Sequence, residues 1–275
     1  MKRLLITGAR GLLGSHLVPM LRQRWEVVAL DRAQADLSRP LDPSILPPRL
    51  DGVVHLAQSS RFRDFPDGAA DMFEVNLARL AELLDHARRA GVRHFVHAST
   101  GSVYARSAEP LAEEMPTAPP DTIGFYAATK LAGELLAHSY APFMTVVSLR
   151  YFFIYGRGQK RDMLVPRLIH SVRADKPVML RGADGLRLNP VHAADAAAAT
   201  AAALDLEWSG IVNVAGPELL SIRAMAEAIG DRLGVEPKFE QSAGETDVLV
   251  ADTTRMRELL VAPQRRFRER LDELL

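Results

Sequence analysis

The stretch TGARGLLG, from Thr7 to Gly14, lies where an apolar run beginning at Lys2 gives way to a helical pattern. In a strand-to-helix turn, Gly8 permits the tight bend, Gly11 lets the backbone approach a pyrophosphate, and Gly14 permits close packing of helix on strand. The N-terminus of the following helix offers free N–H groups to an anion. The stretch therefore predicts the phosphate-binding turn of a dinucleotide-binding unit, although a glycine pattern alone also fits an ordinary structural turn.

The next apolar run, Glu26–Leu30, ends directly before Asp31, about twenty residues beyond the glycines. A carboxylate at this point can accept hydrogen bonds from both hydroxyls of an adenine ribose and repel a 2′-phosphate, which favours NAD. Arg32 could instead attract that phosphate, so NADP stays a less favoured alternative. Asp31 also fits an ordinary turn residue, and Asp36 and Leu37 fit either the flank of an adenine or a solvated loop.

Beyond this unit, short apolar runs continue to alternate with amphipathic stretches. The runs are Gly52–Leu56, Val92–His97 and Phe143–Leu149, and the stretches are Asp71–Arg89 and Phe125–Tyr140. This alternation predicts an α/β fold with a doubly wound parallel sheet. The rhythm changes after about residue 150. We therefore expect a dinucleotide-binding domain over 1–155 and a smaller C-terminal α/β lobe over 156–275, from which some segments return to the first domain. The last stretch, Arg265–Leu275, predicts a solvated surface helix.

Composition narrows the classes of function. The 275 residues suit one large α/β unit, and 34 basic residues balance 34 acidic ones, so no charge excess favours nucleic acid or a membrane surface. A small-molecule partner is expected instead. The absence of cysteine excludes disulfides, thiolate catalysis and cysteine-ligated metals. The apolar start lacks a cleavage pattern, and the alanine-rich segment 193–204 is too short to span a bilayer, so we expect a cytoplasmic protein.

Tyr126 and Lys130 form a candidate catalytic pair. The spacing of four in YAATK puts both side chains on one face of a predicted helix, one turn apart. A tyrosine with a pKa near ~10 is a poor base at neutral pH unless an adjacent ammonium stabilises the phenolate. Thr100 follows a predicted central strand, where its hydroxyl could bind the reacting oxygen or merely cap the strand end.

Seven motifs in a fixed order carry a resemblance. They are TGARGLLG, Asp31, VVHLA at Val53–Ala57, HASTGSVY at His97–Tyr104, YAATK, LRYFFIYG at Leu149–Gly156 and LRLNPVH at Leu186–His192. In this order the chain resembles an extended short-chain dehydrogenase/reductase of the NAD-dependent epimerase/dehydratase type. The resemblance implies a Rossmann domain with a smaller substrate lobe, and a substrate that in many members is a nucleotide sugar. It also implies a homodimer paired through 71–89 and 125–140, although apolar stripes on these helices could simply face the sheet.

The resemblance maps a catalytic tetrad onto Asn76, Thr100, Tyr126 and Lys130. It implies that Tyr126 removes the proton from a sugar hydroxyl while the neighbouring carbon passes hydride to the nicotinamide. Thr100 would orient that oxygen, Lys130 would lower the tyrosine pKa and hold the nicotinamide ribose, and Asn76 would support the lysine. The expected cofactor contacts are Gly8, Arg10, Gly11, Leu12, Leu13, Gly14, Asp31, Arg32, Asp36, Leu37, Leu56, Ala57, Gln58, Asn76, Ala98, Tyr126, Lys130 and Tyr151.

Departures from the family pattern narrow the reaction. Sugar dehydratases carry an acidic pair after the threonine, and UDP-glucuronate decarboxylases carry a glutamate before Val-Tyr, whereas this chain has Gly101 and Ser102 there. Reversible hydride transfer remains, as in a 4-epimerase, a ketoreductase or a dehydrogenase. An amide that contacts the diphosphate in many members is replaced by Phe153. Arg187 is the best candidate for a diphosphate contact, because arginine binds phosphate bidentately.

The expected substrate contacts are Ser59, Thr100, Gly101, Ser102, Tyr126, Phe153, Arg187 and Asn189. Arg61, Lys160 and Arg161 are further candidates, and for Lys160 and Arg161 a solvated loop is the favoured interpretation. No metal site is expected. Two alternatives to a nucleotide-sugar enzyme stay open: an NAD(P)-dependent dehydrogenase or reductase of a free sugar, sugar lactone or other small carbonyl compound, and a cofactor-sensing protein without chemistry.

Overall fold

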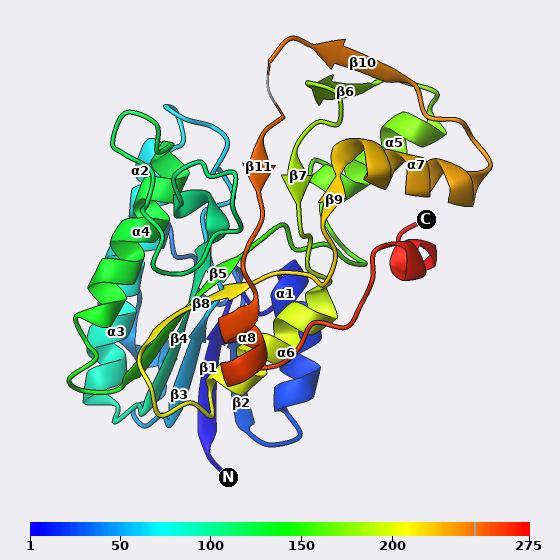
Figure 1. Cartoon of the computed structure of the whole chain (residues 1–275). Coiled ribbons are helices and arrows are strands. Elements are labelled where there is room, and N and C mark those ends of the chain that lie inside the picture. Colours follow the sequence, from blue (N-terminus) through cyan, green and yellow to red (C-terminus); the bar gives the residue numbers. More distant parts are fainter. Residues whose placement is uncertain (245) are drawn as a thin grey trace.

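The structure, a computed structural model, describes residues 1–244 and 246–275 of the chain. Its centre is a parallel six-stranded sheet in the order β2-β1-β3-β4-β5-β8 (Figure 1). The strands are β1, Arg3–Thr7; β2, Glu26–Leu30; β3, Gly52–His55; β4, His94–Thr100; β5, Thr145–Tyr151; and β8, Gly210–Val214. The predicted α/β fold with a parallel, Rossmann-like sheet is confirmed.

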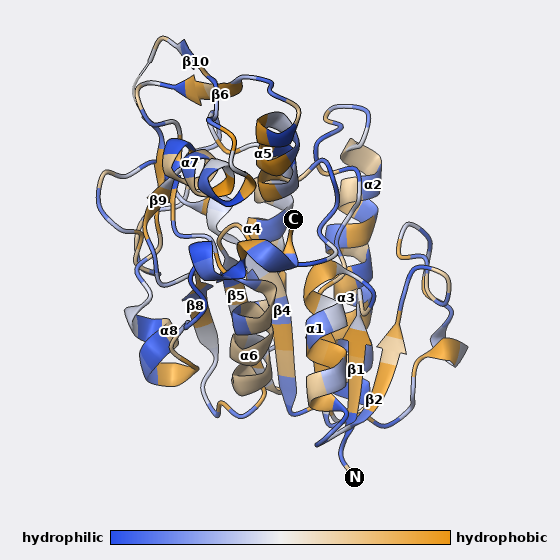
Figure 2. Ribbon diagram, turned by 90° about the vertical axis from the view of Figure 1, so that its right-hand side faces the viewer, coloured by the Kyte–Doolittle hydropathy of each residue, from blue (hydrophilic) through white to orange (hydrophobic). Residues whose placement is uncertain are grey.

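The strands are apolar because helices cover both faces of the sheet. Leu4, Leu5 and Ile6 of β1 are fully buried, and Figure 2 shows the hydrophobic colouring running along the central strands. β4 and β5 continue past the predicted apolar runs, to Thr100 and Tyr151. The predicted runs stop earlier because the last residues of both strands are polar or belong to the site.

Helices form a layer on each face. On one face lie α1, Leu12–Leu21; α6, Ala193–Ala203; and α8, Thr254–Leu259. On the other lie α3, Arg79–Arg89, and α4, Phe125–His138. α3 continues α2, Ala69–Phe73, through a π-helical turn at Glu74–Ala78. Within the described ranges, no helix has the length and hydropathy that a membrane span requires.

The connection from β2 to β3 sets the position of the ligand crevice. It carries one short 3-10 turn, Pro43–Ile45, and returns to the other side of β1, so β1 lies between β2 and β3. The strand order therefore reverses at β1. Open α/β sheets bind ligands beyond the carboxyl ends of the strands at such a reversal.

A smaller group of elements covers those carboxyl ends (Figure 1). Its helices are α5, Leu164–Arg173, and α7, Ile222–Leu233, which pack on each other. Its strands are β6, Val178–Arg181; β7, Arg187–Leu188; β9, Leu220–Ser221; β10, Phe239–Ser242; and β11, Val248–Leu249. β6 pairs with β10, and β7 lies between β11 and β9. We refer to this group as the lobe.

The C-terminal segment differs from the prediction of a solvated helix. It forms a 3-10 helix, Arg268–Glu273, and buries Phe267 and Leu271 in the core of the lobe. The Asp195 carboxylate accepts hydrogen bonds from the backbone N–H groups of Gln264, at 3.0 Å, and Arg265, at 2.8 Å. These contacts hold the segment against α6, which charge patterning alone did not indicate.

Candidate active site

A cavity of about 610 Å³ lies beyond the carboxyl ends of β1, β3 and β4, between the sheet and the lobe. Most of the predicted site residues line it together. They are Gly8, Arg10, Gly11, Leu12, Leu13, Gly14, Asp31, Arg32, Asp36, Leu37, Leu56, Ala57, Gln58, Ser59, Ala98, Thr100, Tyr126, Tyr151 and Phe153.

The glycine turn forms one wall of the cavity. Gly8 has a φ of +71°, in the left-handed region, and a Cβ there would lie 2.8 Å from the Ala57 backbone nitrogen. A Cβ at Gly14 would lie 2.5 Å from the Gly8 carbonyl oxygen. Gly11 is the N-cap of α1 and has no side chain that could cap the helix. The backbone N–H groups of the first helical turn are therefore uncapped, and the residues of that turn line the cavity. The turn thus leaves room for an anion at the helix N-terminus.

Asp31 closes the far end of this wall. Its Oδ1 accepts hydrogen bonds from the backbone N–H groups of Ala33, at 2.8 Å, and Gln34, at 3.1 Å. Its Oδ2 pairs with Arg10 at 2.8 Å, and the Arg10 side chain is 84% exposed. Asp31 therefore caps its own turn and also lines the cavity, while its contact with an adenine ribose stays a prediction.

Tyr126 points its hydroxyl toward Gln58 on the facing loop. The phenol donates a hydrogen bond to Gln58 Oε1 at 2.9 Å. Burial raises the pKa of Tyr126 to about 12, and the Thr100 hydroxyl offsets only part of this effect. We expected Lys130 to lower this pKa, but burial dominates at this geometry. Tyr126 is therefore protonated at neutral pH and able to act as an acid.

Lys130 lies one turn further along α4, and only 2% of its surface is exposed. Burial lowers the pKa of Lys130 to about 8, and the carboxylate of Glu134 opposes that shift. His55 and His97 stack as nearly parallel rings with centroids 6.2 Å apart. Burial, and secondarily the charge of Lys130, lowers the pKa of His55 to about 3 and that of His97 well below its usual value. Both imidazoles are therefore neutral beside the lysine.

Asn76 lies in the π-helical turn before α3, and only 2% of its surface is exposed. Its Oδ1 accepts a hydrogen bond from the Ser59 backbone N–H at 3.0 Å, and its Nδ2 donates to Thr129 Oγ1 at 3.0 Å. The amide thus ties the loop after β3 to the helix that carries Tyr126 and Lys130. The π-turn, a feature frequent at functional sites, gives Asn76 this direction and was not predicted.

Sequence reasoning missed several residues at the lobe end of the cavity. They are Ser60, Phe62, Asp71, Ser99, Ile154, Gln159 and Met163, while Lys160, a weak candidate, also lines it. The Phe62 ring lies 5.3 Å from that of Tyr126, and the Ser59 hydroxyl donates to Asp71. Ser99 and Ile154 lie inside motifs that were recognised, although neither residue was singled out there. The other five come from segments that no motif covers and that only the fold brings together.

Phe153 enters the cavity with a φ of +45°, the left-handed region that bulky residues rarely adopt. It follows β5 at the point where the chain passes into the lobe. Such a conformation costs about 1–3 kcal/mol and persists where the surroundings impose it. The position at which the chain departs from the family pattern, Phe153, therefore also has a strained backbone.

Four predicted substrate contacts do not line the cavity. Arg187 on β7 is exposed outward, because alternation along the strand turns Leu188 to the core instead. The Asn189 amide exchanges hydrogen bonds with the Ala251 backbone, at 2.9 and 3.0 Å. Gly101 is buried where a Cβ would lie 2.5 Å from the Phe152 ring, and Ser102 donates its backbone N–H to Thr100 at 3.2 Å.

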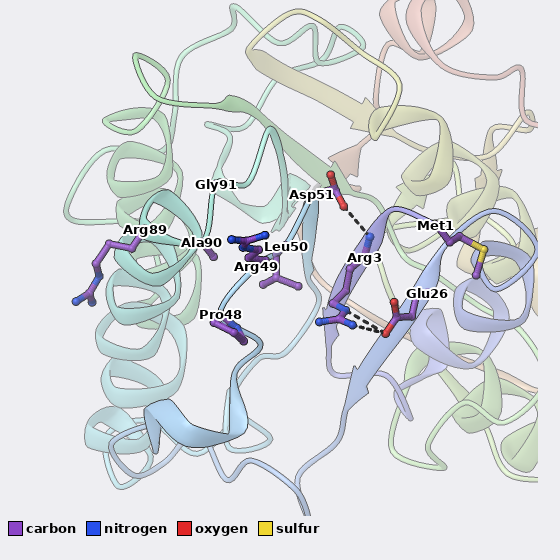
Figure 3. A pocket seen from close by; sticks show the side chains of 10 residues that line it. All are labelled: Met1, Arg3, Glu26, Pro48, Arg49, Leu50, Asp51, Arg89, Ala90 and Gly91. Atoms are coloured by element: carbon purple, nitrogen blue, oxygen red, sulfur yellow. Dashed lines mark hydrogen bonds and ion pairs between the residues drawn. The ribbon is translucent and has the colours of Figure 1, made fainter.

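A second, shallow hollow lies at the opposite, amino-terminal ends of the strands (Figure 3). Arg3 pairs there with Glu26 at 2.8 Å and donates its backbone N–H to Asp51 at 2.8 Å. The Arg3 side chain is therefore already paired, and parallel sheets bind ligands at the other end. We therefore assign the site to the first cavity.

The chain is similar to known proteins both in sequence and in fold. The sequence model of the NAD dependent epimerase/dehydratase family matches residues 4–215. The chain is 28% identical over 302 residues to the uncharacterized UDP-glucose epimerase YtcB of Bacillus subtilis, covering 94% of this chain and 92% of that protein.

Two solved structures are similar over almost the whole chain. The UDP-glucuronic acid 4-epimerase from Bacillus cereus, in complex with UDP-glucuronic acid and NAD, has a TM-score of 0.81 and 26% identity, covering 98% of this chain and 97% of that one. The UDP-glucose 4-epimerase from Thermus thermophilus, in complex with NAD, has a TM-score of 0.80 and 26% identity, covering 99% and 97%.

Proposed function

The chain belongs to the NAD dependent epimerase/dehydratase family, and from this membership we propose that it epimerises or oxidises a sugar carbon of a nucleotide sugar by reversible hydride transfer. The observation that carries the proposal is one cavity that joins the glycine turn to the Thr100 and Tyr126 side chains, with Lys130 buried on the same helix. Relatives over the full length carry names of UDP-glucose and UDP-glucuronic acid epimerases.

The residues at the glycine end fit NAD. The turn at Gly8 and Gly14 leaves no room for side chains, and the uncapped start of α1 suits the pyrophosphate. Asp31 suits the adenine ribose, with Arg10 as its partner. When bound, NAD supplies the acceptor for a hydride from the sugar carbon and can return it. NADP remains the less favoured cofactor.

We assign the proton transfer to Tyr126. Its hydroxyl is protonated, hydrogen-bonded to Gln58, and able to give its proton to a developing alkoxide on the sugar. Accepting a proton in the reverse direction needs the phenolate, which burial disfavours and the Thr100 hydroxyl favours. We assign Lys130 the role of an ammonium that favours the phenolate further. Thr100 lines the same cavity and can orient the reacting oxygen.

The cavity supports hydride transfer over elimination. The acids of the dehydratases and decarboxylases are absent at Gly101 and Ser102, and neither residue lines the cavity. One alternative is an NAD(P)-dependent dehydrogenase or reductase of a free sugar, lactone or small carbonyl compound. The lobe end of the cavity supports this alternative, because Arg187 is turned outward and the aromatic rings of Phe62 and Phe153 line the wall.

An NMR assay separates these possibilities. Purified protein with NAD is mixed with UDP-, dTDP- and GDP-hexoses, and the sugar stereochemistry and NADH are followed together. An inverted sugar without NADH indicates an epimerase, and an oxidised sugar with NADH indicates a dehydrogenase. Tyr126→Phe should abolish either activity while NAD still binds. Turnover that survives in Tyr126→Phe would contradict the assigned role.

We also propose a homodimer formed through the helices of 71–89, which are α2 and α3, and through α4. Phe73 on α2 is 52% exposed, and Leu135 on α4 is 68% exposed, on helices that contact each other. Exposed apolar side chains that gather in one patch mark an interface, and we infer that these two belong to such a patch. Leu135→Asp should yield a monomer in sedimentation, whereas a monomeric wild type at micromolar concentration would refute the dimer.

Two further expectations belong to this proposal. Residues 1–155 form the cofactor domain and residues 156–275 mainly the substrate lobe, with α6, β8 and α8 packed on the sheet, which supports the returning segments. The compartment we propose is the cytoplasm.

A further inference from the structure

Helix α4 carries a third polar side chain on the catalytic face. Tyr126, Lys130 and Glu134 follow each other at spacings of four, so they lie in one column along the helix. The Glu134 side chain is only 3% exposed. Buried carboxylates are rare unless they are paired, and the proposed mechanism does not use this one.

Two strands of the sheet fix the Glu134 carboxylate. Arg150 of β5 binds it in a fork, with Nε 2.9 Å from Oε1 and Nη2 2.6 Å from Oε2. Ser99 of β4 donates its hydroxyl to Oε1. Ser99 lines the cavity and directly precedes Thr100. The carboxylate therefore connects the helix of Tyr126 to the strand end that presents Thr100.

Arg150 is itself held in place. Its guanidinium lies 4.5 Å from the centre of the Tyr104 ring, and the Tyr104 hydroxyl donates to Asn213 Oδ1 at 2.8 Å. Asn213 in turn donates to the Leu111 carbonyl at 2.8 Å. Because these partners are buried and engaged, the fork with Glu134 has little freedom to open.

The groups around Lys130 explain why this carboxylate matters. His55 of β3 and His97 of β4 are neutral, and the phenol of Tyr126 is protonated. His138, further along α4, has a pKa lowered by burial and is neutral at pH 7. Arg150 is cationic but faces Glu134. Among these groups, Glu134 alone favours the charged lysine, whose burial brings its pKa to about 8.

We propose that Glu134 is a positioning residue of the reaction: clamped by Arg150 and Ser99, its carboxylate keeps Lys130 in its ammonium form and aligns the Thr100 strand end with the catalytic face of α4. The proposal rests on the function proposed above only in giving Lys130 and Tyr126 their catalytic roles.

The test measures the lysine directly. The chain has five lysines, so 13C-labelled lysine gives few resonances, and Lys130→Arg identifies the one of interest. Glu134→Gln keeps the shape and an acceptor for Ser99 but removes the charge. In cofactor-free protein, the Lys130 resonance should titrate at least one pH unit lower in this variant. The alkaline limb of the kcat profile should move by the same amount, with little change in the KM for NAD.

Two further variants keep the test decisive. Glu134→Gln leaves Arg150 buried without its partner and can unfold the chain, so Glu134→Gln with Arg150→Met removes the carboxylate charge without leaving a buried cation unpaired. Asp205→Asn, which breaks the exposed pair with Arg24, is the matched control and should shift nothing. An unchanged Lys130 titration in either folded Glu134 variant overturns the proposal. Absence of turnover on nucleotide sugars with a shifted lysine would overturn only the proposed function.

Discussion

Replacing Lys130 by methionine should stabilise the protein at neutral pH while destroying its activity. The lysine is buried, and its pKa falls from 10.5 in the unfolded chain to about 8 in the folded one. The folded state therefore binds the proton less tightly than the unfolded state does. Above pH 10.5 the amine is neutral in both states, so Lys130 does not reduce the free energy of unfolding. This stability is lost as the pH falls from 10.5 through 8, because the unfolded state takes up the proton first.

The size of the effect follows from that difference in pKa. At about 1.36 kcal/mol per pKa unit, burying the charged lysine costs about 3 kcal/mol of unfolding free energy at pH 7. Methionine removes this cost and fills similar space. At pH 9.5 the wild-type lysine is mostly neutral when folded, so the advantage of Lys130→Met should shrink to about 1 kcal/mol.

Urea unfolding of both proteins at pH 7 and 9.5 measures the two differences. Lys176→Met, which changes an exposed lysine, is the control and should show neither gain nor pH dependence. If Lys130→Met is less stable than wild type at pH 7, or if its advantage is the same at both pH values, the buried-charge reasoning is wrong.

Three other changes test the cavity walls. Gly14→Ala places a Cβ 2.5 Å from the Gly8 carbonyl oxygen and should weaken NAD binding at least about tenfold in calorimetry, whereas Gly124→Ala, with open space around it, should not. Phe153→Asn should unfold about 2 °C above Phe153→Ala, because both lose the ring but asparagine tolerates the left-handed backbone better; equal melting temperatures would argue against strain. Asp71→Asn should raise kcat/KM for UDP-glucuronate relative to UDP-glucose severalfold, because it removes a negative charge from the cavity; an unchanged ratio would place Asp71 away from the sugar.

The cofactor end was predictable because its signals are local. The bend at Gly8, the helix start after Gly11 and the carboxylate at Asp31 follow from a few consecutive residues and the strand before them. β1 likewise matches its apolar run, since a strand buried on both faces leaves a continuous signal, and the edge strand β2 matches its run as well.

The lobe end was not predictable in the same way. Asp71 and Met163 meet in the cavity only after the lobe folds back over the sheet. Arg187 and Asn189 looked like ligands, but strand alternation turns the first outward and the Ala251 backbone occupies the second. The pKa of Tyr126 also escaped prediction, because burial is a property of the folded chain.

The position of β2 has a consequence for how the protein behaves at high concentration. Within the described residues, β2 pairs only with β1, so its outer backbone groups form an open sheet edge. Open edges invite pairing between molecules and aggregation. Glu26 places a charge at the start of that edge and pairs with Arg3, as protective charges do on natural edge strands. Replacing this glutamate by a β-branched apolar residue should therefore reduce solubility before it changes catalysis.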